Sequence, residues 1–337
     1  IKMSSVRVKG AEALNGENLK GYYVADGATY IMVDGNEYNN IFPVWNWRKL
    51  PGVTCYQSNA PLKVLTFDGY RNNSDFTGGL SNGLNGITAF HLVRDSLTAK
   101  KAWFFIDNVM VCLGADITSD KDEPVTTTLN QSFLKGDVYY FDGSVKKMNL
   151  ESQISSDDFK WVYHNKIAYY PLQKTQLIVS DKTKYGDWHE IAKVYPSKKQ
   201  SANIFSIDAE HGKSPQHESY SYVILPAITL DEATRYEPTF TVIENKSNAQ
   251  VVSSKDKKLD MFVVYDPVKL SVPGTDVINF EQAGIYMLEQ KNNKWFMTMA
   301  DPTHKLKTFT FTINNKKYSM DLPQNEDLGK SISKEID

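Results

Sequence analysis

Cysteine is nearly absent from this sequence, which has only Cys55 and Cys112 among its 337 residues. Two cysteines cannot build a disulfide framework, and their positions lack the spacing of a metal-binding motif. A single bridge between them stays open. The interpretation we favour is that both are buried thiols that pack as small apolar side chains.

A strong charge of one sign is also missing. The 38 Lys and Arg residues nearly balance the 40 Asp and Glu residues, which gives a formal net charge of −2. No basic run is long enough for a nucleic-acid footprint, so we expect no nucleic-acid partner. A polyanionic ligand would need a local basic patch. The candidates are adjacent basic pairs that are otherwise ordinary surface residues: Arg48-Lys49, Lys100-Lys101, Lys146-Lys147 and Lys198-Lys199.

Long apolar runs are absent as well. No run approaches the ~18 residues that a membrane-spanning helix needs, so we expect a soluble protein with no membrane partner. The chain opens on Ile1-Lys2-Met3, a polar start without the charged and apolar parts of a secretory leader. This start predicts a cut inside a longer polypeptide.

Helix signals are scarce, whereas aromatic residues are plentiful: 19 Tyr, 16 Phe and 6 Trp. This composition favours pleated sheets. Polar and apolar residues alternate through 308–313, and Asn314-Asn315 then separates that run from 316–320, a pattern that predicts a β-hairpin. Asn292-Asn293 and Asp107-Asn108 mark two more hairpins. The convincing helix start is Thr229 to Glu232, which has capping-box spacing and predicts a short helix ending near Tyr236.

Strand-like segments follow one another without helical crossovers, so antiparallel pairing is expected. Further strands are predicted at 125–134, 138–141, 160–164, 167–170, 176–179, 204–208 and 220–225. We therefore predict an all-β fold with a large antiparallel β-sandwich over 1–240, followed by a smaller antiparallel β-sandwich over 241–337. The short helix would mark the boundary.

The densest group of distinctive residues is the segment 39–52, which contains Trp45, Trp47 and Arg48. Two Trp residues at a spacing of two would lie on the same side of an extended strand. Indole rings can stack on the apolar faces of sugars, and an adjacent Arg can bind a carboxylate or sulfate through two hydrogen bonds. The alternative is a pair of core tryptophans with a structural arginine.

The histidines do not form a recognisable site. His211 and His217 lack the helical spacing and the carboxylate partners of a metal site. For these two, and for His91, His164, His189 and His304, we expect an ordinary structural or surface role. The sequence also contains no nucleophile elbow, phosphate-binding loop or dinucleotide fingerprint.

An ordered series of short motifs runs through nearly all of the chain. It comprises residues 15–22 (NGENLKGY), 26–29 (DGAT), the Trp-rich segment, 75–79 (DFTGG) with 81–83 (SNG), 95–105 (DSLTAKKAWFF), 126–131 (TTTLNQ), His211-Gly212 with Tyr220, Tyr222 and Pro226, and 300–302 (ADP). In this order the series resembles the middle and carboxy-terminal β domains of polysaccharide lyase family 8, which includes chondroitin AC, hyaluronan and xanthan lyases.

The resemblance implies cleavage of a uronic-acid-containing polysaccharide by β-elimination. The C5 proton is removed, the C4–O bond breaks, and an unsaturated uronate remains. The substrate carboxylate must be neutralised while a base and an acid move the proton. In the family these groups lie mostly on an amino-terminal helical domain. That domain is absent from this sequence and is the expected partner, so the chain alone would be inactive.

The resemblance also assigns supporting roles to single residues. Glu12 would pair with a catalytic Arg or orient the His, and Asn15 would face the substrate cleft, although Glu12 to Asn15 on their own read as a solvated turn. Phe67 would stack on substrate. Some relatives bind calcium where this chain has Asn46 and Arg48, and because Arg48 would repel a cation we predict no calcium here and no other cofactor.

Two functions are therefore carried forward. The first is the β portion of an extracellular or periplasmic polysaccharide lyase that acts on an acidic polysaccharide, chondroitin sulfate or hyaluronan before others, with Trp45, Trp47, Arg48 and Phe67 binding substrate. The second is a non-catalytic glycan-binding β-sandwich that uses Trp45, Trp47 and Arg48 as its contact strip. A structural adhesion domain without glycan affinity is a third interpretation.

Overall fold

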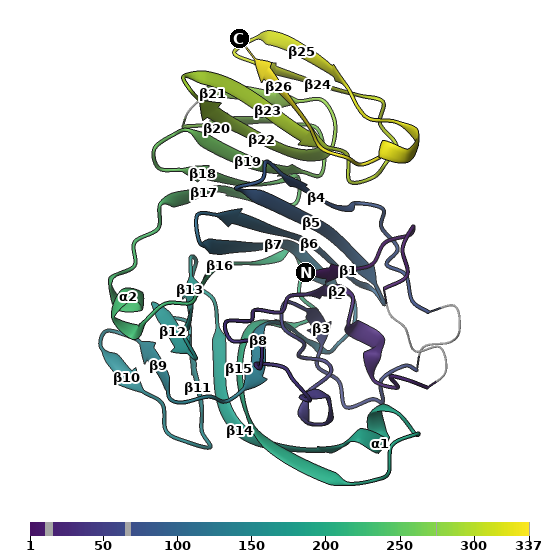
Figure 1. Cartoon of the computed structure of the whole chain (residues 1–337), viewed down its shortest axis with the longest axis vertical. Helices are drawn as coiled ribbons and strands as arrows, with labels where there is room; N and C mark the ends of the chain where they lie inside the picture. The colour runs from purple at the N-terminus through teal and green to yellow at the C-terminus, as the bar shows by residue number, and fades with distance from the viewer. Residues whose placement is uncertain (11–15, 65–68, 274, 337) are drawn as a thin grey trace. The chain divides into compact units, whose positions relative to one another are not determined.

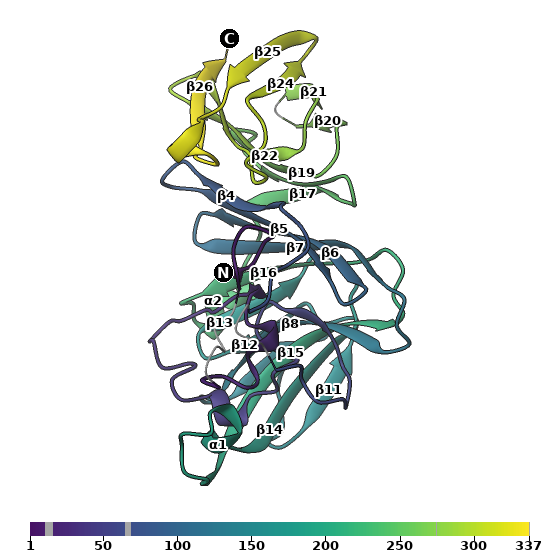
Figure 2. The same cartoon turned by 90° about the vertical axis from the view of Figure 1, so that its right-hand side faces the viewer.

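The structure is a computed structural model that describes residues 1–10, 16–64, 69–273 and 275–336. It confirms the all-β prediction, and the two views in Figures 1 and 2 show sheets throughout. Strand pairs with a defined register are antiparallel, including the long β14–β15 and β8–β15 pairs. The seven strands predicted between residues 125 and 225 all form.

Sheets of nine, five and two strands come from the described residues up to 226. A nine-stranded sheet has the order β10 (Val145–Lys147), β9 (Val138–Phe141), β12 (Trp161–His164), β13 (Ile167–Pro171), β16 (Glu218–Pro226), β7 (Val109–Ser119), β6 (Leu97–Ile106), β5 (Gly86–Arg94) and β4 (Thr77–Ser81). A five-stranded sheet has the order β11 (Gln153–Ser156), β14 (Leu177–Asp187), β15 (Lys199–Lys213), β8 (Pro124–Phe133) and β3 (Thr54–Tyr56). A two-stranded sheet joins β1 (Lys2–Met3) to β2 (Asp26–Ala28).

The carboxy-terminal residues form a second, smaller sandwich. Its six-stranded sheet has the order β17 (Phe240–Asn245), β18 (Ala249–Ser254), β19 (Leu259–Val264), β22 (Gly284–Lys291), β23 (Lys294–Ala300) and β26 (Ile332–Ile336). Its four-stranded sheet has the order β20 (Val268–Val272), β21 (Thr275–Phe280), β24 (Thr308–Ile313) and β25 (Lys316–Asp321). Both sheets supply side chains to one apolar core, which includes Phe262, Phe280, Tyr286, Phe309 and Phe311. Burial of these large rings holds the layers together.

Packing divides the described chain into two units, each built from separate segments. The first comprises 1–74, 92–99 and 117–235, and the second comprises 75–91, 100–116 and 236–337. Strands β5, β6 and β7 contribute residues to both. The expected boundary near residue 240, between consecutive domains 1–240 and 241–337, stays a prediction.

The predicted turns and helix start form as expected. Asn314 and Asn315 have φ angles of 48° and 68° between β24 and β25, and Asn292 and Asn293 have φ angles of 51° and 62° between β22 and β23. Asparagine tolerates this left-handed conformation, which matches the twist of a two-residue hairpin.

The capping box at Thr229 is also confirmed. The Thr229 amide donates a hydrogen bond to the Glu232 carboxylate (2.7 Å), and the Glu232 amide donates to the Thr229 hydroxyl (3.2 Å). These bonds begin helix α2 (Leu230–Arg235). In the described part of the chain, the other helical segments are α1 (Trp188–Ile191) and the 3-10 turns η1 (Gly21–Tyr23), η2 (Phe42–Val44) and η3 (Asn325–Asp327).

Cys55 and Cys112 are both buried thiols, as predicted. Burial raises the pKa of Cys55 to about 12, so this thiol stays protonated at neutral pH. Within the described ranges, no helix has the length and apolar character needed to span a membrane.

Candidate functional site

The Trp-rich segment does not form the extended strand predicted for it. Residues Phe42–Val44 form η2, which has Pro43 in its first turn, and Trp45 to Arg48 continue as loop and turn. Pro43 fixes its own φ near the helical value and removes an amide donor, which favours a helical turn over a strand. The expectation that Trp45 and Trp47 lie on one side of an extended strand was therefore wrong.

Trp45 and Trp47 nevertheless lie side by side. Their ring centroids are 5.6 Å apart and the rings are nearly perpendicular (88°). Phe42 packs against both rings, and Tyr30 stacks on Trp45 at an interplanar angle of 13°. Each indole N–H is satisfied within the fold: Trp45 donates to the carbonyl of Gln131 (3.2 Å) and Trp47 to that of Phe42 (3.1 Å).

The two indoles belong mainly to the core of the first unit. Trp45 is 7% exposed and Trp47 is 3% exposed, and both pack in the cluster that contains Leu50 and Val53. Both also line one groove of about 440 Å³, together with Leu19, Lys20, Asn46, Arg48, Ser58, Pro61, Leu62 and Glu190. We call this the Trp groove. Contact between substrate and the Trp residues stays a prediction.

Arg48 lies in the Trp groove with part of its guanidinium already engaged. Its Nη1 donates to the Tyr23 hydroxyl (3.0 Å) and its Nη2 donates to the carbonyl of Ala60 (2.8 Å). Burial raises the pKa of Tyr23, so its phenol is neutral. Tyr23 therefore does not compensate the positive charge of Arg48. In the same groove Lys20 pairs with Glu190. Arg48 is therefore the groove cation best placed to meet a carboxylate or sulfate.

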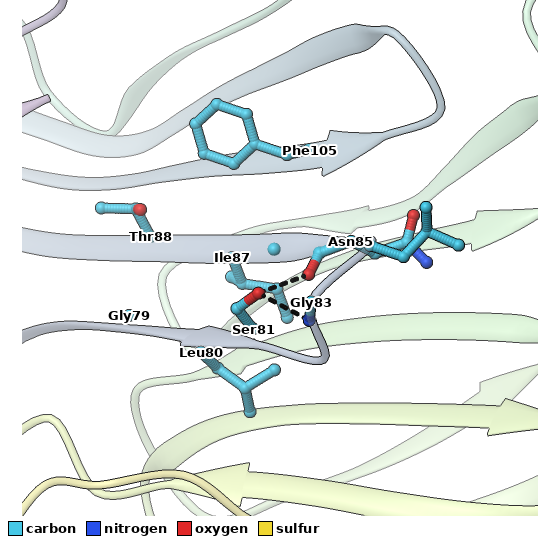
Figure 3. A pocket seen from close by; sticks show the side chains of 10 residues that line it. Gly79, Leu80, Ser81, Gly83, Asn85, Ile87, Thr88 and Phe105 are labelled. Atoms are coloured by element: carbon cyan, nitrogen blue, oxygen red, sulfur yellow. Dashed lines mark hydrogen bonds between the residues drawn. The ribbon is translucent and has the colours of Figure 1, made fainter.

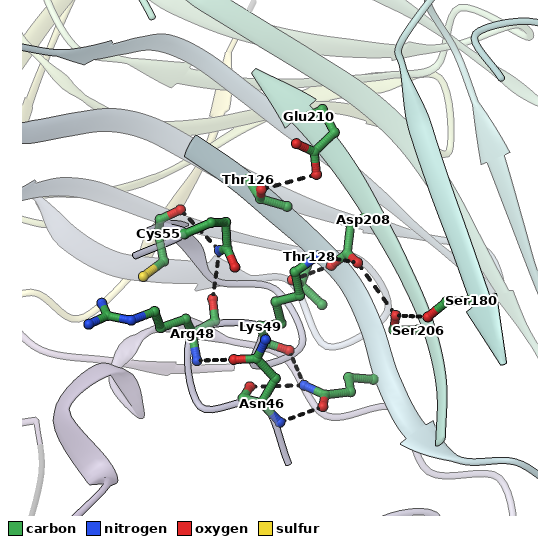
Figure 4. A network of polar contacts seen from close by, with 12 residues as sticks. Asn46, Arg48, Lys49, Cys55, Thr126, Thr128, Ser180, Ser206, Asp208 and Glu210 are labelled. Atoms are coloured by element: carbon green, nitrogen blue, oxygen red, sulfur yellow. Dashed lines mark hydrogen bonds and ion pairs between the residues drawn. The ribbon is translucent and has the colours of Figure 1, made fainter. Parts of the chain in front are cut away.

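A band of polar side chains follows the facing strands β8 and β15. We call it the polar face, and it consists of Thr126, Thr128, Ser206, Asp208 and Glu210 (Figure 4). The Thr128 hydroxyl donates to Asp208 (2.6 Å), and the Thr126 hydroxyl donates to Glu210 (3.1 Å). Lys49 joins this face through an ion pair of 2.9 Å between its Nζ and Asp208.

The same loop connects the polar face with the Trp groove. The amide of Asn46 donates to the Gln131 side chain (2.8 Å), whose Nε2 donates back to the carbonyls of Asn46 (3.1 Å) and Lys49. Gln131 thereby fixes the backbone on both sides of Arg48. Burial raises the pKa of Glu210, while Lys49 and Thr126 partly offset that shift. A carboxyl group of this kind holds a proton more readily than one in water.

Sequence reasoning did not single out the polar face. Period-two polarity is visible on β15, where Ser206, Asp208 and Glu210 alternate with apolar residues, but not on β8, where residues 126–128 are all threonine. Such alternation shows that a strand has a polar side, but it does not reveal that these strands, 80 residues apart, are neighbours.

Sequence reasoning also missed a buried cation. Arg94 is 4% exposed, pairs with Asp26 and lies between aromatic rings, with its Cζ 3.7 Å from the Tyr22 centroid and 3.2 Å from the Tyr70 centroid. Aromatic faces and a carboxylate together compensate for loss of hydration. Burial acts to raise the pKa of Asp95, but hydrogen bonds from Lys63 and Tyr22 outweigh this effect, so the pKa of Asp95 lies below its ordinary value.

The histidines with defined contacts have structural surroundings. His164 stacks on Phe205 with centroids 4.3 Å apart, and its Nε2 accepts a hydrogen bond from the Lys135 amide (2.9 Å). Burial lowers the pKa of His164 to about 3, so its imidazole is neutral. His211 contacts the Thr127 hydroxyl through Nε2 at 2.8 Å.

Three of the predicted site residues, Glu12, Asn15 and Phe67, lie outside the described residues. Among the residues that are described, no group of three or more His, Cys, Asp and Glu side chains could hold a metal ion. At the position considered for calcium, Arg48 and its hydrogen bonds occupy the loop. The expectation of no calcium stays a prediction.

Comparison with known proteins gives a consistent family. The model for the polysaccharide lyase family 8 super-sandwich domain matches residues 1–237, and the model for the family 8 C-terminal beta-sandwich domain matches residues 241–310. These matches cover most of the chain, which belongs to polysaccharide lyase family 8. The resemblance inferred from the motif series is thus confirmed.

Particular relatives can be named from the same comparisons. The chain is similar to the Chondroitinase-AC of Pedobacter heparinus (35% identity, 98% of this chain, 48% of the relative) and to the Hyaluronate lyase HylB of Enterococcus faecalis (25% identity, 97% of this chain, 34% of the relative). A solved chondroitinase AC lyase superposes with a TM-score of 0.92 at 34% identity, covering 98% of this chain and 50% of that one. The chain spans about half the length of the two chondroitinase AC lyases and about a third of the length of HylB.

Proposed function

We propose that this chain is the β portion of a polysaccharide lyase that cleaves chondroitin sulfate or hyaluronan by β-elimination. The observation that supports this most is the 35% identity to a Chondroitinase-AC, which extends over 98% of the chain and includes the Trp-rich segment. In this proposal the chain forms one wall of the substrate cleft, and a helical amino-terminal domain supplies the groups that move the proton.

The Trp groove is the part of the wall that would meet the polymer. Arg48 carries a fixed positive charge, and Gln131 fixes the backbone around it. An anionic substrate group placed near Arg48 would be stabilised by a charge-assisted hydrogen bond. Glu12 and Asn15 would support catalysis at the cleft, and Phe67 would stack on a sugar ring. Each of these roles rests on family resemblance.

β-Elimination explains why the chain should be inactive alone. Removing the C5 proton next to a carboxylate builds negative charge on a group that is already charged, so the reaction needs a base, an acid and donors that neutralise the carboxylate. The polar face offers Lys49, but this ammonium is paired with Asp208. In this proposal the described residues bind the polymer, and the base and the acid come from the other domain.

The test compares two purified proteins. One is the 337-residue chain, and the other is the whole protein encoded by the gene. Each is incubated with chondroitin sulfate or hyaluronan, and the ultraviolet absorbance of the unsaturated uronate is followed. We expect product only from the whole protein. Product from the chain alone would contradict the assignment of proton transfer to another domain, and binding without product from the whole protein would favour a non-catalytic glycan-binding module.

We further propose an extracellular or periplasmic location. A polysaccharide substrate is too large and too polar to cross a membrane unaided, so its depolymerase must meet it outside the cytoplasm. Fractionation of cells that express the whole gene, followed by detection of the protein in each fraction, tests this. Retention in the cytoplasmic fraction alone would contradict it.

A further inference from the structure

We propose that the second unit carries an accessory binding site for an anionic polysaccharide, on elements that do not belong to the Trp groove. This inference rests on the proposed function for the class of its ligand. The site combines an exposed aromatic ring on a bare stretch of sheet with a neighbouring hollow that contains lysines. The two parts meet at Leu84 and Asn85.

The first part is a shallow hollow of about 530 Å³ on strands β4, β5 and β6 (Figure 3). We call it the Phe105 platform. Phe105 is 38% exposed. The side chains of Leu80 and Ile87 point to the buried side of the sheet, whereas Phe105 and Thr88 lie on the open side.

Glycines keep the Phe105 platform flat. Gly79 pairs with Thr88, and Gly86 pairs with Ser81, so each cross-strand pair has only one side chain. A Cβ atom at Gly86 would lie 3.7 Å from Cδ2 of Phe105. The ring therefore rests beside bare backbone. A flat apolar ring with hydroxyl groups around it suits the C–H face and the rim hydroxyls of a sugar.

An alternative role for Phe105 is to cover a strand glycine and so compensate for its missing side chain. This role explains contact with Gly86, but it does not explain the hollow beside the ring. None of the residues lining that hollow is charged. The platform by itself would therefore accept the uncharged face of a sugar without selecting for acidic groups.

The second part supplies the charge. It is a hollow of about 780 Å³ that we call the lysine hollow, and its basic residues are Lys255, Lys258 and Lys291. Lys291 is paired with Glu289 at 2.6 Å. Lys255 and Lys258 form no ion pair with any residue in the described ranges. Their ammonium groups are available to a carboxylate or sulfate.

The turn between β18 and β19 holds these two lysines in place. The Ser254 hydroxyl donates to Asp256 (2.6 Å), the Lys258 amide donates to Asp256 (3.1 Å), and the Lys255 amide donates to the carbonyl of Thr239 (2.8 Å). These bonds fix the backbone of the turn, so the entropy lost when a ligand binds comes mainly from the lysine side chains.

The lysine hollow also contains four carboxylates, Asp107, Glu237, Asp256 and Glu289, which work against an anion; three of them have a hydrogen-bond or ion-pair partner within the fold. Asp256 is held by the turn, Asp107 accepts from the Thr239 hydroxyl (2.7 Å), and Glu289 accepts from the Asn82 amide (2.7 Å) and pairs with Lys291. Lysine stems are long and flexible enough to bring the ammonium groups of Lys255 and Lys258 to a ligand. A polymer that alternates sugar faces with acidic groups fits this combination of platform and lysines.

The experiment measures amide hydrogen exchange in the 337-residue chain, with oligosaccharides of chondroitin sulfate or hyaluronan as the probes. It is done in the Arg48→Gln background, so that binding at the Trp groove does not dominate. We expect ligand-dependent protection at 79–88 and 254–259. We expect Phe105→Leu, which keeps apolar bulk, and the double variant Lys255→Gln/Lys258→Gln each to weaken that protection at least threefold.

Matched controls are Tyr185→Leu, which removes another exposed aromatic ring, and Lys198→Gln/Lys199→Gln, which removes the same number of exposed charges. Both controls should retain full protection. Protection that is absent, or that survives the Phe105 and lysine variants, would overturn the accessory site. Failure of the lyase proposal is recognised separately, by the absence of unsaturated product from the whole protein with both polymers.

Discussion

Asp208 is the residue on which the polar face depends most. It is 1% exposed and has two strong partners, the Lys49 ammonium (2.9 Å) and the Thr128 hydroxyl (2.6 Å). In Asp208→Ala both partners lose their acceptor, while Lys49 is exposed enough to regain part of its hydration. We expect the free energy of unfolding to fall by about 2 kcal/mol, measured from urea unfolding curves.

The control for this prediction is Lys146→Ala, which breaks the pair between Lys146 and Asp142. That lysine is well exposed, and pairs of this kind add little to stability, so the unfolding midpoint should stay the same. Equal losses of unfolding free energy in Asp208→Ala and Lys146→Ala would contradict a larger contribution of the Lys49–Asp208 pair to stability.

His164 makes stability depend on pH. Its pKa is about 3 in the fold because of burial, whereas a histidine in an unfolded chain has a pKa of about 6.5. Between these values the unfolded chain binds the extra proton, so this residue's contribution to stability falls as pH drops from about 6.5 toward 3. At pH 5 the loss relative to pH 7 should be about 2 kcal/mol.

The variant His164→Gln retains an acceptor for the Lys135 amide but cannot gain a proton. We expect a smaller difference in unfolding free energy between pH 7 and pH 5 than in the parent chain. His217→Gln, at an exposed histidine, controls for loss of an imidazole. An unchanged pH difference in His164→Gln would contradict the prediction.

At the scale of elements, the close approach of η2 to β14 determines where the Trp groove can form. A Cβ atom on Gly186 would overlap the carbonyl oxygen of Pro43, and backbone cannot swing aside as a side chain can. Gly186→Ala should therefore displace η2 and lower the free energy of unfolding by about 1–3 kcal/mol, the usual cost of overpacking.

Because η2 leads into Trp45 and Trp47, the near-ultraviolet circular dichroism of Gly186→Ala should change as well. The neighbouring Lys184→Ala, at an exposed position of the same strand, should leave the spectrum unaltered. A Gly186→Ala chain with the parent spectrum and stability would show that η2 adapts without cost.

Elements were predictable from the sequence where the deciding signal is local. Two adjacent asparagines specify a tight hairpin through their own backbone preference, and Thr229 with Glu232 specifies a helix start through bonds within four residues. The extended strand expected in the Trp-rich segment did not form because the shape of this segment depends on Pro43 and on β14, which lies more than 130 residues away. The polar face and the Arg94 cluster also depend on pairings between distant segments.

At the scale of the whole molecule, a net charge of −2 gives no long-range attraction for a polyanion. Any anionic polysaccharide must therefore be held by local cations whose reach is the screening length, about 8 Å at physiological salt. Affinity of the Arg48→Gln chain for chondroitin sulfate oligosaccharides should fall as sodium chloride is raised, because Lys255 and Lys258 carry the attraction.

The double variant Lys255→Gln/Lys258→Gln should bind more weakly and show an almost flat salt dependence, since the uncharged Phe105 platform remains. Phe105→Leu should bind more weakly but keep the salt dependence of the Arg48→Gln chain. Titration calorimetry at several salt concentrations separates these two patterns. Equal slopes for all three proteins would mean that the attraction comes from other cations, such as Lys20 of the Trp groove.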